Sequence, residues 1–222
     1  NESLFSTNGN FNAKHSVFCG GLFSDRLAKK DKLNLDMQIV GFRGDYYHLS
    51  ESAKNKVNNL IYPVPNAEFP FLGVHLTRMI DGSIECGPNA VFTFKREGYH
   101  KTDFSCRDTL ETLSFSGTWR LFINHWKFGF NEYRRAFSKV LFLKALKKLI
   151  PTLEMQDIIE SRSGVRAMAL AKNGEVIDDF KIVKSKNNLH VLNAPSPAAT
   201  ACLAIGDQIL QQAKKHFKLE IK

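Results

Sequence analysis

Residues 37–49 read MQIVGFRGDYYHL, a run whose β-branched and aromatic residues predict a long β-strand. Three further strand-like runs follow, namely LIYPVP at 60–65, FLGVHLTRMI at 71–80 and SIECGPNAVFTF at 83–94. Prolines and the Asp81-Gly82 pair separate these runs, as turn residues do between strands. We therefore predict a mixed, largely antiparallel sheet in the middle of the chain, with helices beside it, in an α+β fold.

On the N-terminal side of this sheet, residues 1–19 predict a hairpin. Its strands are SLFS and HSVFC, on either side of a turn at residues 7–10. Gly20 and Gly21 end the second strand, and a short helix is expected over residues 23–30.

On the C-terminal side, helical spacing takes over between residues 104 and 150. A basic helix is predicted over residues 131–150, and Pro151 closes it. Its expected buried face comprises Phe137, Val140, Leu141, Ala145, Leu146, Leu149 and Ile150. Phe142 and Leu143 widen that face, so packing on a core is favoured while an interfacial membrane helix stays open.

The last quarter of the chain returns to strands and closes with a helix. VRAMALAK at 165–172 and VIDDFKIV at 176–183 flank an Asn173-Gly174 turn, and HVLNA at 190–194 precedes a helix expected over about residues 197–217.

Composition limits the class of protein. The 222 residues are 43% apolar and 24% charged, as in an ordinary globular protein with a substantial core. No apolar run approaches the roughly 18 residues of a membrane span, and no export signal is visible, so a cytoplasmic location is expected. The four cysteines form no C-x-x-C pair and lie in apolar contexts, which predicts reduced core thiols and no metal site.

The net charge of +9 would suit an anionic partner. Much of the excess lies in lysine-rich segments at 139–148, 181–186 and 214–222, without the aromatic pattern that specifies nucleic acid. We interpret it as a solvated basic surface that can draw in a small dicarboxylate, and we expect no nucleic-acid partner.

Two stretches carry side chains suited to a small acid. SRSGVRA at 161–167 spaces two arginines around a glycine, and a guanidinium can bind a carboxylate with two hydrogen bonds. Surface arginines are the alternative. In FLGVHLTRMI, alternation places His75 on the side of the strand opposite Val74 and Leu76, where a satisfied core histidine is the alternative to a functional one.

Residues 193–206 read NAPSPAATACLAIG and predict an uncovered helix N-terminus. Ser196 can cap the helix, Pro197 suits its first position, and small residues such as Ala198 and Ala199 allow a flat group close to the backbone. The free amides suit an anion or a polarised carbonyl. An ordinary Ser-Pro cap without a ligand is the alternative.

Several of these stretches occur together and in order in one family. GFRGDYYHL, LIYPVPNAEFPFLGVHLTRMIDGSIECGPNAV, FKREGY, SRSGVRA, DDF and LNAPSPAATACLAIG strongly resemble the L-2-hydroxyglutarate oxidase/dehydrogenase family, within the D-amino-acid-oxidase-like flavoproteins. The resemblance implies FAD as cofactor, a full-length α/β architecture and oxidation of L-2-hydroxyglutarate to 2-oxoglutarate. It covers nearly the whole chain, apart from two departures: Asp45 stands where Glu is usual and Met168 where Gln is common.

The family begins with a dinucleotide-binding unit that has a G-x-G-x-x-G turn, and this sequence contains no such motif. We expect a C-terminal portion of a flavoprotein, either cut or encoded in truncated form, and inactive on its own. The resemblance then divides the chain into the last strands of an FAD-binding domain (1–34), a substrate domain (35–155) and a C-terminal FAD-domain segment (156–222).

The resemblance also suggests roles for individual residues. Arg166 takes the place of an arginine that clamps the substrate carboxylate, and His75 aligns with a position facing the flavin, as base or hydrogen-bond donor. The predicted substrate-binding residues are Arg43, which ranks first for a second carboxylate, Tyr47, Arg78 and Arg162. The predicted cofactor-binding residues are Gly20, Gly21, Asn193, Pro195, Ser196, Ala198, Ala199 and Thr200.

Three hypotheses therefore stay open at this stage. The first is the flavin-dependent oxidation of L-2-hydroxyglutarate, the second a related reaction on another 2-hydroxy or amino acid, and the third a non-catalytic binding or oligomerising module. The electron acceptor is oxygen or a quinone. Peripheral membrane contact and a homo-oligomer are both compatible with the sequence.

Overall fold

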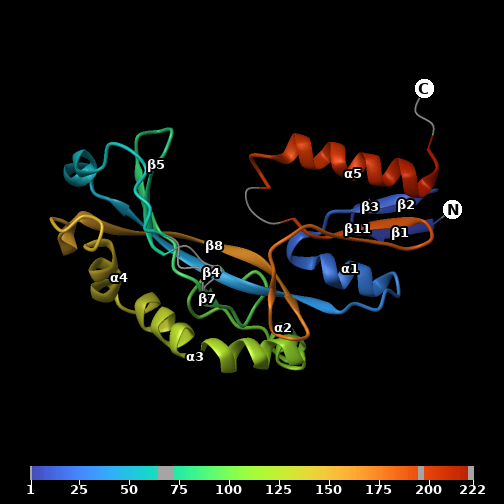
Figure 1. Cartoon of the computed structure of the whole chain (residues 1–222), viewed down its shortest axis with the longest axis horizontal. Coiled ribbons are helices and arrows are strands. Elements are labelled where there is room, and N and C mark those ends of the chain that lie inside the picture. Colours follow the sequence, from blue (N-terminus) through green and yellow to red (C-terminus); the bar gives the residue numbers. More distant parts are fainter. Residues whose placement is uncertain (1, 65–72, 195–197, 220–222) are drawn as a thin grey trace. The chain divides into compact units, whose positions relative to one another are not determined.

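The computed structural model describes residues 2–64, 73–194 and 198–219, without the side chain of Glu2 (Figure 1). The chain divides into two compact units. We call Asn1–Ile39, Ala169–Ala171 and Ile177–Lys222 the terminal unit, and Val40–Met168 with Lys172–Val176 the central unit. The mixed strands and helices confirm the predicted α+β class; the three domain boundaries stay a prediction.

The terminal unit begins with a tight hairpin. Strands β1 (Glu2–Ser6) and β2 (Gly9–Ala13) pair in antiparallel register from Glu2↔Ala13 to Ser6↔Gly9. Gly9 has a φ of +129°, which a side chain would make costly. The predicted pairing of SLFS with HSVFC is wrong, because the two-residue turn returns the chain along β1 before residue 15 is reached.

A second sheet of the terminal unit has the order β10-β11-β3. Strand β3 (Ser16–Phe18) pairs in parallel with β11 (Asn188–Asn193), which in turn pairs in antiparallel with β10 (Lys181–Lys184). After β3 come the 3-10 turn η1 (Gly21–Phe23) and helix α1 (Ser24–Lys30), close to the predicted helix at 23–30.

The closing helix α5 (Cys202–Phe217) packs Ala213, Ile209 and Phe217 against Leu189 and Val191 of β11. Its N-cap is Ala201, about five residues beyond the predicted start. Residues 198–201 form a turn instead, so the small residues before Cys202 precede the helix. Ser196 and Pro197, on which that prediction rested, lie outside the described residues.

The long strand β4 (Met37–Leu49) coincides with the predicted run. It belongs to a six-stranded sheet in the order β5-β6-β4-β8-β9, with β7 also paired to β4. The other members are β5 (His75–Arg78), β6 (Ile84–Gly87), β7 (Val91–Phe92), β8 (Ile158–Ala171) and β9 (Val176–Ile177). In the predicted LIYPVP strand, the described residues show an isolated bridge between Ile61 and Leu76.

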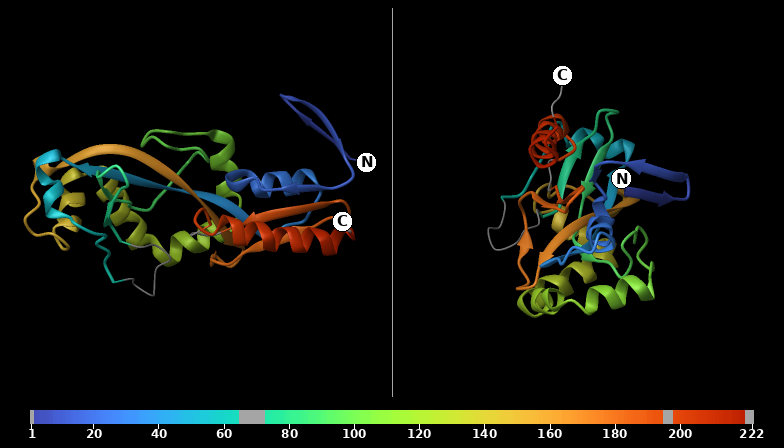
Figure 2. Two further views of the ribbon diagram at one scale, coloured as in Figure 1. Left: turned by 90° about the horizontal axis from the view of Figure 1, so that it is seen from above. Right: turned by 90° about the vertical axis from the view of Figure 1, so that its right-hand side faces the viewer.

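Helices of the central unit run along one side of β4 and β8 (Figures 1 and 2). They are α2 (Cys106–Leu113), α3 (Ser116–Ala136) and α4 (Lys139–Leu146), and the short turns η2 (Glu51–Lys56) and η3 (Met155–Asp157) flank the sheet. The single helix predicted over residues 131–150 is wrong. Ser138 has an extended backbone and its hydroxyl accepts a hydrogen bond from the Leu141 amide, so a second helix starts there.

The predicted buried face of that segment also needs correction. Phe142 and Leu146 are fully buried in the core of the central unit, whereas Phe137 and Val140 are 64% and 62% exposed. The break at Ser138 changes the helical phase between the two halves, which a single helical pattern does not anticipate. Phe142 and Leu143 thus belong to the core and give no sign of membrane contact.

The cysteines and the longest helices bear on two further predictions. All four cysteines are free, but Cys19, Cys106 and Cys202 are exposed and Cys86 alone is buried, so the prediction of core thiols is wrong for three of them. Among the described residues, no helix has the length and apolar character needed to span a membrane.

Candidate functional site

The register of the central sheet separates the predicted substrate residues onto two faces. Tyr47 pairs with Cys86, and Cys86 with Leu76, so these three side chains share one face. They lie in the core with Phe142 of α4. We call this the core face. The intervening positions, which include His75, point to the opposite side, which we call the His75 face.

Strand β8 places its two predicted arginines on the His75 face. The Ser163 hydroxyl donates to Asp45 Oδ1 over 3.0 Å, and Asp45 shares the core face with Tyr47 by strand alternation. Arg162 and Arg166, at the alternate positions of β8, therefore project on the other side. Both side chains are exposed.

His75 is held by its backbone and by an aromatic neighbour. Its Nδ1 lies 3.0 Å from the Gly73 carbonyl oxygen, and its ring stacks on Tyr62 with 4.4 Å between centroids. Burial lowers the pKa of the imidazole below its usual value, and the positive charge of Arg166 acts in the same direction. The ring is therefore neutral near neutral pH. Because a carbonyl only accepts, Nδ1 carries the proton and Nε2 is left as acceptor.

Arg166 and His75 thus lie on the same face, and the charge of Arg166 is felt at the imidazole; their roles in a site stay predictions. Within the described ranges, no hydrogen bond or ion pair engages the Arg166 guanidinium. A free guanidinium beside a neutral imidazole can bind a carboxylate and accept a proton from a hydroxyl next to it.

Arg162 lines a polar cavity of about 410 Å³ with His100, Lys101 and the two serines of β8, Ser161 and Ser163. Lys101 reaches Glu160 over 2.6 Å at the same cavity. The cavity therefore lies on the Ser163 side of β8, and the charge of Lys101 at its wall is already paired with Glu160.

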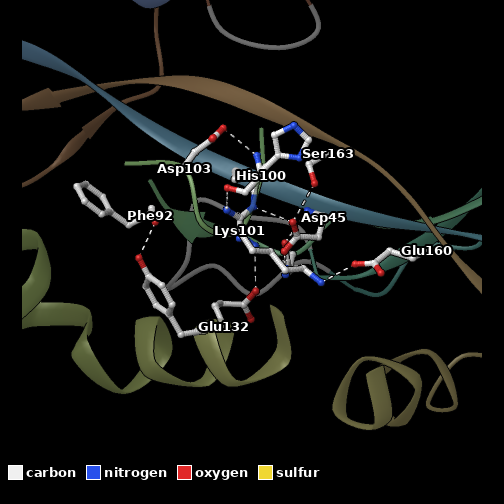
Figure 3. Close-up of polar contacts among 12 residues, drawn as sticks. Asp45, Phe92, His100, Lys101, Asp103, Glu132, Glu160 and Ser163 are labelled. Atoms are coloured by element: carbon white, nitrogen blue, oxygen red, sulfur yellow. Dashed lines mark hydrogen bonds and ion pairs between the residues drawn. The ribbon is translucent and has the colours of Figure 1, made fainter. Parts of the chain in front are cut away.

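Arg43, which ranked first for the second carboxylate, is 4% exposed on the core face. Its Nε donates to Asp45 Oδ1 over 2.7 Å and its Nη1 to the His100 carbonyl over 2.8 Å (Figure 3). Asp45 also accepts from Asn89 Nδ2 at 2.9 Å. The guanidinium is therefore part of a buried network that fixes the loop at residue 100 to β4, and the structure does not bring it together with His75.

Two more predicted substrate residues have structural partners. Tyr47 is 4% exposed and packs on Phe142, and burial raises the pKa of its phenol. Arg78 donates from Nη1 to the Val57 carbonyl over 3.0 Å. Among the described residues, no hydrogen bond or ring contact joins either side chain to His75, and their substrate roles stay predictions.

A second buried network joins α3 to the strand region at 89–92. Glu132, 3% exposed, accepts from the Ala90 amide at 2.9 Å and pairs with Arg135 at 2.6 Å, and Tyr133 donates to the Phe92 carbonyl (Figure 3). Burial raises the pKa of Glu132 in spite of that pairing. These contacts set the position of α3 on the sheet.

In the terminal unit, two of the predicted cofactor residues, Gly20 and Gly21, follow directly after β3. Because β3 is parallel to β11, the carboxyl ends of these two strands meet at the same edge of the sheet. The Ser24 hydroxyl donates to the Leu192 carbonyl over 2.8 Å and ties the segment after β3 to β11. Such edges are where α/β folds bind nucleotide cofactors.

The fit of this edge to a flat cofactor can be judged from its backbone. Gly21 has a φ of +50°, and nothing lies within 4 Å of the place where a Cβ would stand. Helix α5 starts without a side-chain cap, so its first amides are free of intrahelical partners. Both features fit a flavin cofactor. Asn193, by contrast, donates from Nδ2 to the Ile177 and Asp179 carbonyls, and Pro195 and Ser196 lie outside the described residues.

Sequence reasoning missed Tyr62, whose ring stacks on His75, because it belongs to a separate run with no recognisable spacing to residue 75. It also missed Glu85, which pairs in register with Thr77 and His48 on the His75 face. Alternation along β4 and β6 predicts which residues of each strand share a face. Which residues of the two strands lie opposite each other is known only from the strand register.

The class of protein follows from comparison with known families. Residues 3–212 match the model of the FAD dependent oxidoreductase family, DAO. The chain therefore belongs to this family, as the sequence resemblance predicted.

Curated relatives indicate which members of the family this chain is similar to. The chain is 46% identical over 215 residues to an L-2-hydroxyglutarate dehydrogenase of Indibacter alkaliphilus, covering 96% of this chain and 54% of the relative. It is 45% identical to one of Escherichia coli K12 (93% and 49% covered) and 43% to a mitochondrial one of Nematostella vectensis (98% and 49%). The chain thus spans about half the length of these relatives.

Solved structures support the fold. Dithionite-reduced L-alpha-glycerophosphate oxidase from Mycoplasma pneumoniae with FAD bound superposes with a TM-score of 0.64 at 20% identity, over 94% of this chain and 45% of that one. A glycerol-3-phosphate dehydrogenase from Bacillus halodurans complexed with FAD gives 0.59 at 13% identity, over 96% and 34%.

Proposed function

We propose that this chain supplies the substrate-binding residues, and part of the cofactor-binding edge, of an FAD-dependent enzyme that oxidises L-2-hydroxyglutarate to 2-oxoglutarate. The observation that carries the proposal is that strand register and alternation put His75 and Arg166 on one face of the central sheet, in a chain about 45% identical to L-2-hydroxyglutarate dehydrogenases. A 2-hydroxy acid needs one cation for its carboxylate and one base for its hydroxyl, and this face holds both.

In this proposal Arg166 binds the carboxylate next to the reacting carbon with two hydrogen bonds, for which its free guanidinium is suited. The distal carboxylate is assigned to the exposed guanidinium of Arg162, which projects from the same face of β8 as Arg166. Arg43 holds the loop at His100 against β4 on the other face, which is a positioning role. Arg78 and Tyr47 remain weaker proposals for the same substrate.

His75 is assigned the proton of the substrate hydroxyl. The Gly73 carbonyl fixes the proton on Nδ1, so Nε2 faces the substrate as acceptor, and the stack with Tyr62 holds the plane of the ring. When bound, FAD supplies the acceptor for the hydrogen of the reacting carbon as hydride. Because burial and Arg166 both lower the pKa of His75, the imidazole keeps its acceptor form below neutral pH.

The backbone of Gly20, Gly21 and residues 198–200 is proposed to hold the cofactor, together with the start of α5. Free amides at a helix start stabilise negative charge, which suits a reduced flavin. Asn193 is proposed to act through the backbone, because its side chain is engaged with residues 177 and 179.

Peripheral contact with the inner face of a membrane and a quinone acceptor are part of the proposal, and oxygen is the alternative acceptor. Two alternatives to the reaction itself are a related oxidation of another 2-hydroxy or amino acid, and a non-catalytic module, in which a homo-oligomer would be expected.

Flavin binding is tested first on the chain itself. Titration with FAD should quench flavin fluorescence and give a protein that keeps the yellow colour on gel filtration. If the chain does not retain flavin, the same titration is made after joining it to the part of the Indibacter alkaliphilus relative that the match leaves out. A colourless protein in both forms would favour the non-catalytic module.

Substrate specificity is tested in the form that retains flavin. Reduction of the flavin by L-2-hydroxyglutarate, and not by the D-enantiomer or by L-glutamate, is the expected result. Reduction by a different 2-hydroxy or amino acid at higher kcat/KM would replace the first proposal by the second.

A further inference from the structure

Helix α3 carries a row of large apolar side chains that face solvent. Trp119, Ile123, Trp126 and Phe130 are 52%, 70%, 62% and 60% exposed. Trp119 and Ile123, and likewise Trp126 and Phe130, are four residues apart and share a side of the helix, and the two pairs lie before and after the kink at His125. Large exposed apolar patches on a protein surface mark contact sites. We call these four residues, with the exposed Phe137 that follows them, the α3 stripe.

An apolar cavity opens beside this stripe. It has a volume of about 500 Å³, lies where the backbone of α3 departs from helical geometry at His125, and is walled by aromatic rings of the sheet and of α3. Trp126 and Phe130 belong both to its wall and to the stripe. The surface therefore combines projecting aromatic rings with a hollow suited to an apolar chain.

Positive charge surrounds the stripe. Residues 116–150 contain eight lysines and arginines and one acidic residue, Glu132, which is buried and paired with Arg135. A groove of about 220 Å³ between α3 and α4 is lined by Arg134, Arg135, Lys144 and Lys148. Lys127 and Arg134 lie 5.7 and 5.9 Å from the ring centres of Trp126 and Phe130. Cations thus stand directly beside the apolar side chains.

We propose that the α3 stripe and the basic groove dock on the surface of an anionic phospholipid bilayer. Aromatic and aliphatic side chains flanked by lysine and arginine are the composition of helices that lie in the membrane interface. In this arrangement the stripe enters the boundary of the acyl chains, and the groove binds lipid phosphates. The proposal deepens the membrane contact named above and gives it a surface.

The two tryptophans of the chain both lie on the stripe, so the protein reports its own docking. The chain is mixed with vesicles of phosphatidylcholine alone or with a quarter phosphatidylglycerol, without flavin or substrate. We expect sedimentation with the anionic vesicles, weakened by salt, a blue shift of tryptophan emission, and quenching by lipids brominated in the acyl chain. Because flavin and substrate are absent, failure here is separate from failure of the proposed reaction.

Two double variants locate the contact. Trp126→Ser with Phe130→Ser should remove the quenching, and Lys144→Glu with Lys148→Glu should weaken binding to anionic vesicles at least about tenfold. The matched controls, Phe5→Ser with Phe11→Ser and Lys184→Glu with Lys186→Glu, change equally exposed positions of the terminal unit and should bind as the parent does.

Three results would overturn the proposal. The first is no sedimentation with anionic vesicles. The second is binding that the α3 and α4 variants leave unchanged or that the control variants reduce equally. The third is self-association that Trp126→Ser with Phe130→Ser abolishes, without vesicle binding, because the stripe would then cover a second copy of this chain.

Discussion

The core face and the His75 face of the central sheet use the same residue types for opposite purposes. Arg43 on the core face is 4% exposed and shares its donors between Asp45 and the His100 carbonyl. Arg166 on the His75 face is exposed, and its charge lowers the pKa of His75. Burial turns the first guanidinium into a fixed part of the structure, while exposure leaves the second available for a ligand.

The largest effect is expected from Asp45→Ala, which would break the network of the core face. Removing this carboxylate leaves the Arg43 charge buried without its partner, and such losses cost about 3–5 kcal/mol of unfolding free energy. Urea unfolding of the chain measures it. Glu97→Ala, at an exposed acidic position of the same unit, is the control and should change little. Equal stability of the two variants would contradict the structural role given to the network.

Replacing each of the two arginines by alanine gives the next test. Arg166→Ala should lower kcat/KM for L-2-hydroxyglutarate about a hundredfold in the flavin-retaining form, because charge-assisted hydrogen bonds to the carboxylate are lost. Its unfolding midpoint should stay near that of the parent. Arg43→Ala should do the reverse, with a clear loss of stability even in the absence of substrate. If Arg43→Ala proved stable and defective only in KM, the original ranking of Arg43 as a direct substrate ligand would be right.

Removing the imidazole of His75 is expected to lower activity no more than Arg166→Ala does. His75→Ala should lower kcat by about a hundredfold, at the low end of the range for general bases. His75→Gln, which keeps a polar group, separates hydrogen bonding from proton transfer. Stopped-flow reduction of the flavin measures the step directly, and unchanged reduction rates in both variants would remove His75 from the reaction.

The comparison also shows what the sequence could and could not reveal. Strand β4 and helix α1 followed from local patterns, because alternation and turn residues act over a few positions. The parallel pairing of β3 with β11 did not, since its partners are about 170 positions apart and share no local signal. The break at Ser138 was hidden because a capping serine inside an apolar run is also compatible with a continuous helix.

For the site, the resemblance singled out His75 and Arg166, which share one face of the sheet, and Arg43 and Tyr47, which lie on the other face. Residue type and spacing predict which residues of a strand share a face. Which of the two faces packs on the helices is decided by long-range contacts, such as that of Tyr47 with Phe142. The exposed apolar side of α3 was missed for the same reason. In the sequence, the apolar residues of α3 and those near Phe142 look alike, and only long-range packing decides which of them are buried.

The smallest expected effect probes the coupling between the two residues of the His75 face. Arg166→Gln removes a positive charge that opposes protonation of the imidazole, so the pKa of His75 should rise, while burial continues to hold it down. NMR titration of the histidine ring signals in the chain itself would show this, with His75→Gln to assign the signal. Arg107→Gln, an exposed position of α2, should leave the pKa unchanged.

The sign of that shift has a consequence for activity. A higher pKa means that Nε2 is protonated, and so unable to accept the hydroxyl proton, over a wider range of acidic pH. The acidic limb of the kcat/KM profile in Arg166→Gln should therefore move toward neutral pH, in addition to the loss from weaker substrate binding. If the pKa of His75 did not respond to Arg166, the two side chains would be electrostatically independent, which would count against a shared substrate site on this face.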